Sequence, residues 1–183
     1  MSFSLINRIT NKIRIDKNNS VVLGKKFKMS GCQVIIKGKN NCLNIGDNIR
    51  LRDVFIQITG NNCTIHIGSG SMIGRDSYIS ARENNISLTI GQRCAFSRNV
   101  KIMTSDGHPI YKDGVRINEA KNITIEDDVW VADNVTILKG VTIGSGSVVG
   151  INSTVVKNIP KESVAVGNPA KVVKENITWQ DKF

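Results

Sequence analysis

The amino-acid sequence predicts an all-β solenoid in which short parallel strands wind in stacked coils of three. Two observations predict it: a motif that recurs every 22 or 23 residues, and apolar residues that fall six apart within each repeat. The motif appears as KNNCLNIG, GNNCTIHIG and ENNISLTIG, which end at Gly46, Gly68 and Gly91. A spacing of six fits neither the 3.6-residue period of a helix nor the alternation of a hairpin. Stacked coils explain it, because each coil buries its apolar row against its neighbours.

The chain is expected to begin with a cap on the first coil. From Ser4 to Arg14, the residues Leu5, Ile6, Ile9 and Ile13 stand at helical spacing. Solenoids need polar or helical caps at their ends. The sequence therefore predicts a short amphipathic capping helix and entry segment within residues 1–20.

Three columns of apolar residues define the body of the solenoid over residues 21–159. One residue per coil belongs to each column, and six coils at a strand spacing of ~4.8 Å give a prism roughly 29 Å long. Of the 18 positions, 17 are apolar, and the exception, Gln57, lies between Ile56 and Ile58, which predicts a local register shift. An antiparallel sandwich is the alternative fold, but such a fold gives no reason for apolar residues to recur every six positions along the chain. The columns are Leu23, Ile45, Ile67, Ile90, Ile125, Ile143; then Met29, Leu51, Ile73, Phe96, Val131, Val149; then Ile35, Gln57, Ile79, Ile102, Ile137, Val155.

The corners between coils differ in length. Coil starts are separated by 22, 22, 23, 35 and 18 residues, so one corner holds 17 extra residues. The shorter insertions contain Asn40-Asn41, Asn61-Asn62 and Asn84-Asn85, and asparagine tolerates left-handed turns and bonds to its own backbone. Beyond Pro160 the count lapses, so residues 160–183 are expected to form a turn, a last strand and a tail.

The long insertion, residues 103–121, contains one of the two histidines of the chain. Ser105-Asp106-Gly107 favours a turn, and Pro109 holds the preceding residue extended, so His108 is expected on a defined loop at a corner. Long loops in compact folds are disproportionately functional. From the residues alone, His108 is either a solvated loop residue or a functional one. His66 lies in a slot taken by polar surface residues in other coils, which indicates a structural or surface role.

Composition limits the class of protein. The chain has 25 Lys and Arg against 15 Asp and Glu, so its partners are expected to be anionic. Its four cysteines form no CxxC pair and no apolar run is long enough for a signal peptide or a membrane span. We expect one soluble cytoplasmic domain with reduced cysteines.

The segments TSDGHPI, ITIEDDVWVADNVTILKGVTIGSGSVVGINSTVVKNIP and AVGNPAKVV complete the pattern. With the hexapeptide count, they resemble the left-handed β-helix acyltransferases, in the branch of the galactoside, maltose and nodulation-factor O-acetyltransferases, close to capsule and O-antigen O-acetyltransferases. The resemblance covers Leu23 to Lys174. It implies a left-handed helix, a homotrimer with active sites between neighbouring prisms, and acetyl-CoA as donor without a metal.

The resemblance also implies site residues. His108 would be the general base that takes a proton from the acceptor hydroxyl during direct transfer, and Asp106 would either orient the imidazole or only form the turn. Asp76 would contact the acceptor. Trp130 would pack beside the acceptor and the pantetheine arm, and the remaining donor contacts would be Ala132, Gly150, Asn152, Lys157 and Lys171, the two lysines on the CoA phosphates.

Other functions fit less well. A γ-type carbonic anhydrase needs three zinc-binding histidines and the chain has two. A non-catalytic scaffold would need neither the loop nor the Trp130 segment, and nucleic-acid binding lacks a stacking motif. The acceptor stays open: a sugar hydroxyl of a surface polysaccharide or its precursor comes first, and an amino nucleotide sugar or an antibiotic is the alternative.

Overall fold

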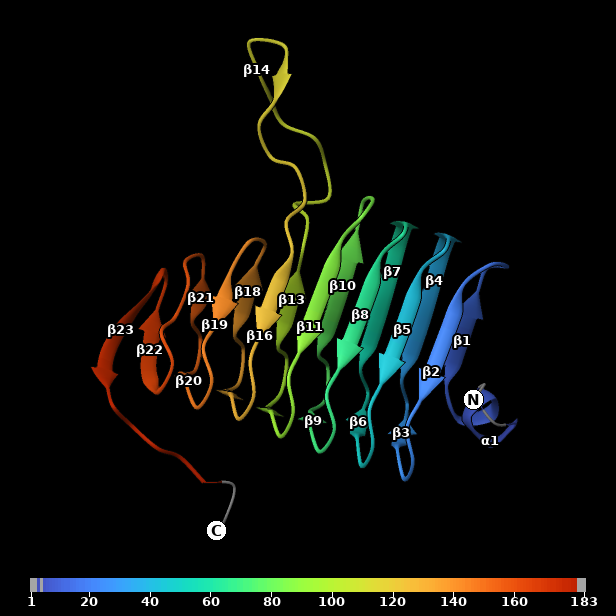
Figure 1. Ribbon diagram of the computed structural model, residues 1–183, viewed down its shortest axis with the longest axis horizontal. Helices are drawn as coiled ribbons and strands as arrows, with labels where there is room; N and C mark the ends of the chain where they lie inside the picture. The colour runs from blue at the N-terminus through green and yellow to red at the C-terminus, as the bar shows by residue number, and fades with distance from the viewer. Residues whose placement is uncertain (1–2, 4, 181–183) are drawn as a thin grey trace.

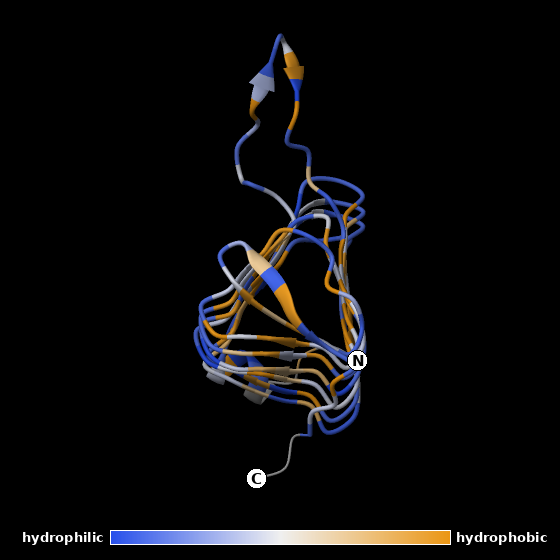
Figure 2. Ribbon diagram, turned by 90° about the vertical axis from the view of Figure 1, so that its left-hand side faces the viewer, coloured by the Kyte–Doolittle hydropathy of each residue, from blue (hydrophilic) through white to orange (hydrophobic). Residues whose placement is uncertain are grey.

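The computed structural model describes residue 3 and residues 5–180, which form a three-sided prism of parallel strands (Figures 1 and 2). We name its sides face A, face B and face C. Face A holds β1 (Lys12–Ile15), β4 (Gln33–Lys39), β7 (Phe55–Asn61), β10 (Tyr78–Arg82), β13 (Lys101–Met103), β18 (Thr136–Leu138) and β21 (Thr154–Val155). Face B holds β2 (Ser20–Leu23), β5 (Cys42–Ile45), β8 (Thr64–Ile67), β11 (Ser87–Ile90), β16 (Ile123–Ile125) and β19 (Thr142–Ile143). Face C holds β3 (Lys28–Ser30), β6 (Arg50–Arg52), β9 (Met72–Ile73), β12 (Ala95–Phe96), β17 (Trp130–Val131), β20 (Val148–Val149), β22 (Ser163–Gly167) and the antiparallel β23 (Ala170–Glu175).

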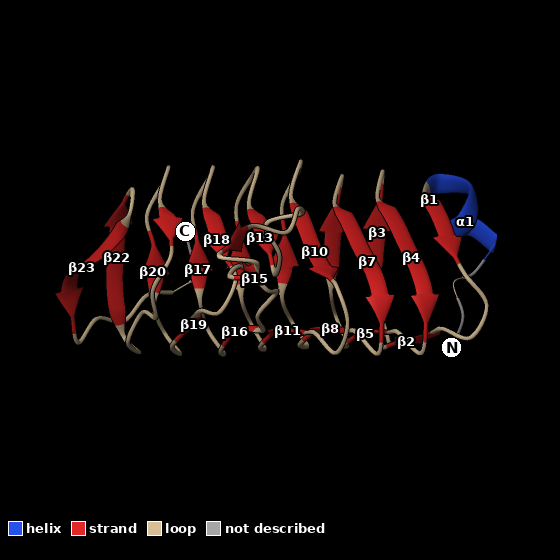
Figure 3. Ribbon diagram, turned by 90° about the horizontal axis from the view of Figure 1, so that it is seen from above, coloured by secondary structure: helices blue, strands red, loops and turns tan. Residues whose placement is uncertain are grey.

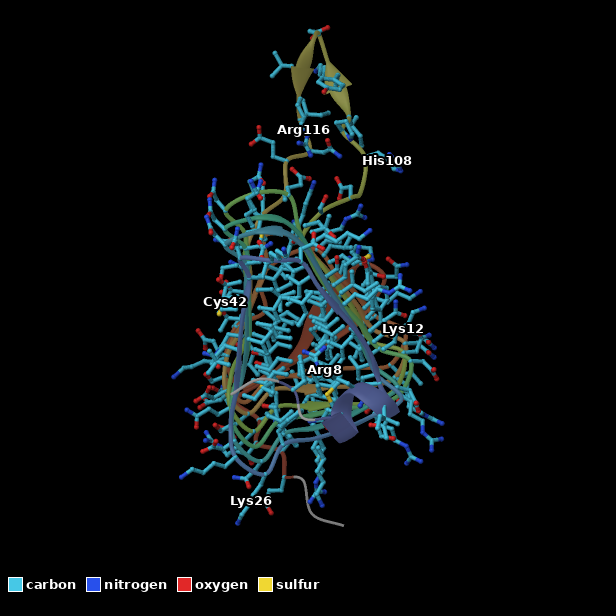
Figure 4. The ribbon with its side chains drawn as sticks, turned by 90° about the vertical axis from the view of Figure 1, so that its right-hand side faces the viewer. Arg8, Lys12, Lys26, Cys42, His108 and Arg116 are labelled. Atoms are coloured by element: carbon cyan, nitrogen blue, oxygen red, sulfur yellow. The ribbon has the colours of Figure 1, made fainter. Side chains whose placement is uncertain are left out.

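The prism winds with a left hand. Seen from the N-terminal end (Figure 4), the chain descends face B, which carries Cys42, and crosses face C at the base. It then climbs face A, which carries Lys12, while it moves away from the viewer. This counter-clockwise path confirms the predicted left-handed β-helix, although parallel crossovers are usually right-handed.

The predicted columns form the core. Ile90 pairs with Ile125, Phe96 with Val131 and Ile102 with Ile137, each across the long insertion. All six of these side chains are buried. The inserted residues therefore leave the stack in register, and the core continues beneath them.

The prediction for the third column was wrong in the first coil. Val34 and Ile56 point into the core, whereas Ile35 and Gln57 are only partly buried. The predicted shift at Gln57 is confirmed, but it already begins at Ile35. In these two coils the corner from face C to face A is one residue shorter than in the later coils. Met29 and Val34 are five residues apart, whereas Ile73 and Ile79, in a later coil, are six residues apart.

Residues with a positive φ stand at every corner but the one after β21, which explains why Asn, Asp and Gly recur there. They are Lys26, Asn48, Gly70, Arg93, Asp128, Gly146 and Glu162 between faces B and C; Gly31, Asp53, Asp76, Asn99, Asn134 and Asn152 between C and A; and, outside the long insertion, Asn18, Gly38, Asn40, Gly60, Asn62, Glu83, Asn85 and Gly140 between A and B. The side chains of Asn61 and Asn84, at the corners between faces A and B, form hydrogen bonds to the backbone of the preceding coil. The side-chain oxygen of Asn61 accepts from the Lys39 N–H (2.9 Å), and that of Asn84 accepts from the Asn61 N–H (2.9 Å).

The two ends differ from the prediction. The helix α1 covers only Leu5–Thr10, and Lys12–Ile15 is strand β1, paired with β4; Ser4 lies outside the described residues. Phe3 is buried and packs near Phe27, so it closes the first coil, whereas Ile9 is largely exposed. At the other end the coil continues past Pro160, because β22 pairs in parallel with β20 and buries Ala165.

Asn41 provides a test of the contacts between coils. Its buried side chain donates to Gly60 O (2.8 Å) and accepts from the Cys63 N–H (2.9 Å). Asn41→Ala leaves both backbone groups unpaired, so the free energy of unfolding should fall by about 2–3 kcal/mol in a denaturant titration. Asn44→Ala, on the outer side of β5, is the control and should change it by less than ~0.5 kcal/mol. Equal losses in the two variants would contradict this account.

Candidate active site

The long insertion forms an arm that leaves the corner between faces A and B (Figures 1 and 2). Its outer part is a hairpin of β14 (Tyr111–Lys112) and β15 (Val115–Arg116). The hairpin turns at Asp113 and Gly114, which both have positive φ. Asp-Gly favours such a tight turn, so these two residues explain where the arm reverses.

Asn118 fastens the two limbs of the arm together. Its side-chain nitrogen donates to the carbonyl of His108 (2.8 Å) and to Asp106 (2.9 Å), and its oxygen accepts from the Ile110 N–H (2.6 Å). Asn118 is 8% exposed, so these bonds are largely shielded from water. The backbone on both sides of His108 is thereby fixed.

Lys139, from the following coil, supports the same segment. Its ammonium donates to the Asp106 carboxylate (2.5 Å) and to the carbonyl of Asn118 (2.8 Å). This charged hydrogen bond is the main cause that lowers the pKa of Asp106 below its ordinary value. Asp106 therefore stays ionised at neutral pH and holds the arm to the prism.

Glu83, from the preceding coil, holds the base of the arm. Its carboxylate accepts from Ser105 (2.7 Å) and from Arg116 (2.6 Å). Burial alone would raise the pKa of Glu83, but these bonds outweigh it and the pKa is lowered. Both carboxylates thus stabilise the arm above their unfolded pKa of about 4, and that contribution is lost as the pH falls below it.

His108 itself is exposed, and its side chain points away from the arm (Figure 4). The imidazole is therefore free to meet a ligand, while its backbone is anchored by Asn118. The carboxylate of Asp106 is engaged by Lys139 and Asn118. The expectation that Asp106 orients the imidazole stays a prediction.

Trp130 lies on the opposite side of the prism, on the outer surface of face C. It is 39% exposed, because successive residues of a strand face opposite sides and its neighbour Val131 points into the core. Its ring lies 6.1 Å from that of Trp179, measured between centroids. Trp179 belongs to the tail, which runs back from β23 towards the middle of the molecule (Figures 1 and 3), and its indole N–H donates to Asp128 O (2.6 Å).

A cleft of about 620 Å³ opens beside Trp179. The tail forms one wall through Trp179 and its neighbours, and face C forms the other through Met72 and Ala95. Cys94 also borders the cleft, but burial, with smaller effects from its neighbours, raises its thiol pKa to about 11. A neutral thiol is a poor nucleophile.

The other predicted site residues lie on face C or at its borders. Ala132 and Gly150 follow β17 and β20, and a side chain on Gly150 would collide with Val166 (2.5 Å). Asp76 and Asn152 are left-handed corner residues, and Asn152 accepts from Asn134 (3.1 Å). These contacts give each a structural reason to be present, and their binding roles stay predictions.

Lys157 and Lys171 are exposed and form no ion pair with any described residue. Lys157 follows β21, and Lys171 lies on β23. Both are therefore open to an anionic ligand at the C-terminal end of the prism.

Two further findings concern residue 3 and residues 5–180. This part of the chain contains no group of three His, Cys, Asp or Glu side chains that could hold a metal ion. It also contains no helix long and apolar enough to cross a membrane.

The sequence did not indicate four residues of the site: Glu83, Asn118, Lys139 and Trp179. The first three form hydrogen bonds to the arm, Glu83 and Lys139 from other coils and Asn118 from the far limb of the arm. Periodicity does not show such contacts, although the Asp113-Gly114 signal could have revealed the hairpin that brings Asn118 opposite His108.

No protein-family model matches the chain. Among curated proteins, it is 34% identical over 172 residues to a polysialic acid O-acetyltransferase of Neisseria meningitidis, covering 92% of this chain and 79% of that one. It is 46% identical over 118 residues to a polysialic acid O-acetyltransferase of Escherichia coli O1:K1 / APEC, covering 61% of this chain. That match spans 38% of the length of the E. coli protein.

Solved structures agree. The polySia-specific acetyltransferase NeuO superposes with a TM-score of 0.76 at 33% identity, covering 94% of this chain and 89% of that one. A hexapeptide-repeat acetyltransferase of Vibrio cholerae O1 biovar eltor, solved with acetyl-CoA, has a TM-score of 0.52 at 26% identity and covers 83% of this chain and 69% of that one. The chain therefore belongs to the left-handed β-helix, hexapeptide-repeat acetyltransferases, in the branch that contains the polysialic acid O-acetyltransferases.

Proposed function

We propose that the protein transfers the acetyl group of acetyl-CoA to a sugar hydroxyl of an acidic surface polysaccharide or of its precursor. The observation that carries this is the exposed His108 on an arm whose backbone is anchored, in a chain that is 34% identical to a polysialic acid O-acetyltransferase. The net charge of +10 suits an acidic acceptor and the phosphates of CoA. The reduced cysteines fit a cytoplasmic location.

In the proposed reaction, neutral His108 accepts the proton of the sugar hydroxyl as its oxygen attacks the thioester carbonyl carbon. The carbon–sulfur bond then breaks, and the imidazolium returns its proton to the leaving thiolate. The raised pKa of Cys94 argues against an acyl-enzyme on that residue and favours direct transfer. Asp106 acts through the backbone, because Asn118 joins it to the carbonyl of His108.

The donor is placed on the C-terminal half of face C. Trp130 contacts the pantetheine arm, and the small residues Ala132 and Gly150 leave room for it. Lys171 lies on β23 of the same face, whereas Lys157 follows β21 of face A and would reach the phosphates from a neighbouring copy. Neither lysine forms an ion pair with a described residue, so both are available. Lysine there supplies a point charge and not a bidentate fork.

A complete site then requires two copies of the chain. The arm that carries His108 extends from the corner between faces A and B, and the strands of face C lie on the opposite side of the prism (Figure 1). Trp130 belongs to β17 of face C. The arm also exposes Ile110, Tyr111 and Val115 by 53%, 62% and 67%, an apolar surface that a neighbour would cover. We propose a homotrimer in which the arm of one subunit meets face C of the next.

His108→Ala should lower kcat by about 10²–10⁴-fold, because it removes the general base, while the thermal midpoint stays unchanged. Release of free CoA, with mass spectrometry of the product, measures it across acceptors that include polysialic acid, an amino nucleotide sugar and a chloramphenicol-like compound. His66→Ala, on face B, is the matched control and should keep wild-type activity. Wild-type kcat in His108→Ala on the best acceptor would refute the mechanism.

Asn118→Ala should loosen the arm without disturbing the prism, since the three bonds around His108 are lost. We expect faster amide hydrogen exchange across residues 105–118 and kcat/KM lowered by about 10- to 100-fold. Exchange in β8 and β11 should not change. Glu119→Ala, at the neighbouring exposed position, is the control. Protection of the arm that is the same in Asn118→Ala as in wild type would contradict its anchoring role.

A further inference from the structure

The positive charge of the chain is concentrated at its N-terminal end. Residues 1–52 contain 11 Lys and Arg against two Asp and no Glu, whereas residues 53–183 contain 14 against 13. The net charge of +10 therefore resides almost wholly in the first two coils. Face C of these coils exposes Lys28, Arg50 and Arg52.

These cations share a row with Trp130. Along the outer surface of face C, Lys28 pairs in register with Arg50, Arg50 with Met72, Met72 with Ala95, and Ala95 with Trp130. Adjacent parallel strands lie ~4.8 Å apart, so Arg50 is about 14 Å and Lys28 about 19 Å from Trp130 along the prism. A straight path of five strands thus links the predicted acceptor site to the basic end.

The path is hollowed along its length. A groove of about 420 Å³ runs from Lys28, Arg50 and Arg52 to Met72. The cleft of about 620 Å³ beside Trp179 begins at Met72 and continues past Ala95. Met72 borders both hollows, so they lie next to each other along face C, between the basic end and Trp179.

The cations at the far end of this groove are available. Lys28, Arg50 and Arg52 form no ion pair with any described residue. The nearby acids are engaged elsewhere: Asp53 pairs with Arg75 (3.6 Å), and Asp47 accepts from the backbone N–H of Lys25 (2.6 Å). Arg50 donates only to the Met72 sulfur (3.9 Å), so three adjacent cations without a carboxylate partner among the described residues favour an anionic ligand.

We propose that the N-terminal half of face C is an extended acceptor site, which holds an acidic polysaccharide several residues away from the hydroxyl that is acetylated. We name it the basic track and define it by Lys28, Arg50 and Arg52. This inference rests on the proposed function and deepens it. The donor occupies the C-terminal half of the same face, so the polymer approaches Trp130 from the other direction, and only an oligosaccharide is long enough to reach both ends.

The test compares Lys28→Gln/Arg50→Gln/Arg52→Gln with a control that removes the same charge from face A, Lys12→Gln/Arg14→Gln/Lys37→Gln. For long-chain polysialic acid, KM should rise about tenfold in the track variant, with kcat and the KM for monomeric sialic acid unchanged. Added salt should weaken wild-type binding more than track-variant binding. The control should stay within about twofold of wild type.

Binding of fluorescent polysialic acid without acetyl-CoA separates this inference from the proposed function. If wild type binds the polymer and the track variant does not, the basic track is supported, even if no acetyl group is transferred to this acceptor. Wild-type KM and binding in the track variant, or equal losses in the track and control variants, would overturn it. It would also be overturned if the track bound anionic phosphatidylglycerol vesicles and not the polymer.

Discussion

The rest of the structure depends on the register between successive coils. Backbone pairing keeps Ile90 opposite Ile125 although 35 residues separate them, and the apolar columns continue without a gap. A stack of this kind tolerates an insertion at a corner, because the inserted chain lies outside the core. The arm that carries His108 is therefore added to a scaffold that does not change to accommodate it.

Precision in the arm comes from its neighbours in the stack. Glu83 and Lys139 project from the coils before and after the insertion, and each binds one part of the arm with a charged hydrogen bond. Asn118 then joins the two limbs at His108. A regular solenoid thus supplies fixed anchor points at known spacing, and an irregular segment becomes ordered by binding to them.

The sequence predicted what repeats. The columns and the left-handed corners follow from a period of six and from Asn and Gly, because each coil faces the same physical demands as the next. The coil number was wrong: six coils were predicted, whereas face A has seven strands in the described part of the chain, since β1 and β21 begin and end the stack. The sequence did not predict the features that occur only once along the chain. The shift at Ile35 comes from one shorter corner, α1 ends at Thr10 because the chain starts to pair with β4, and Trp179 reaches Trp130 from a tail that has no period. Likewise, no period shows that Lys139, a residue 33 positions away, engages the carboxylate of Asp106.

One consequence of the stack is that His108 and Trp130 lie on opposite sides of a single prism, so a site that uses both residues is made by two copies of the chain. Mixed assembly tests this directly. His108→Ala and Trp130→Ala should each be nearly inactive alone, but trimers formed from an equal mixture after unfolding and refolding should recover about a quarter of the wild-type rate, since about one interface in four joins an intact His108 to an intact Trp130. Mixed trimers that stay as inactive as the two parents would contradict the account.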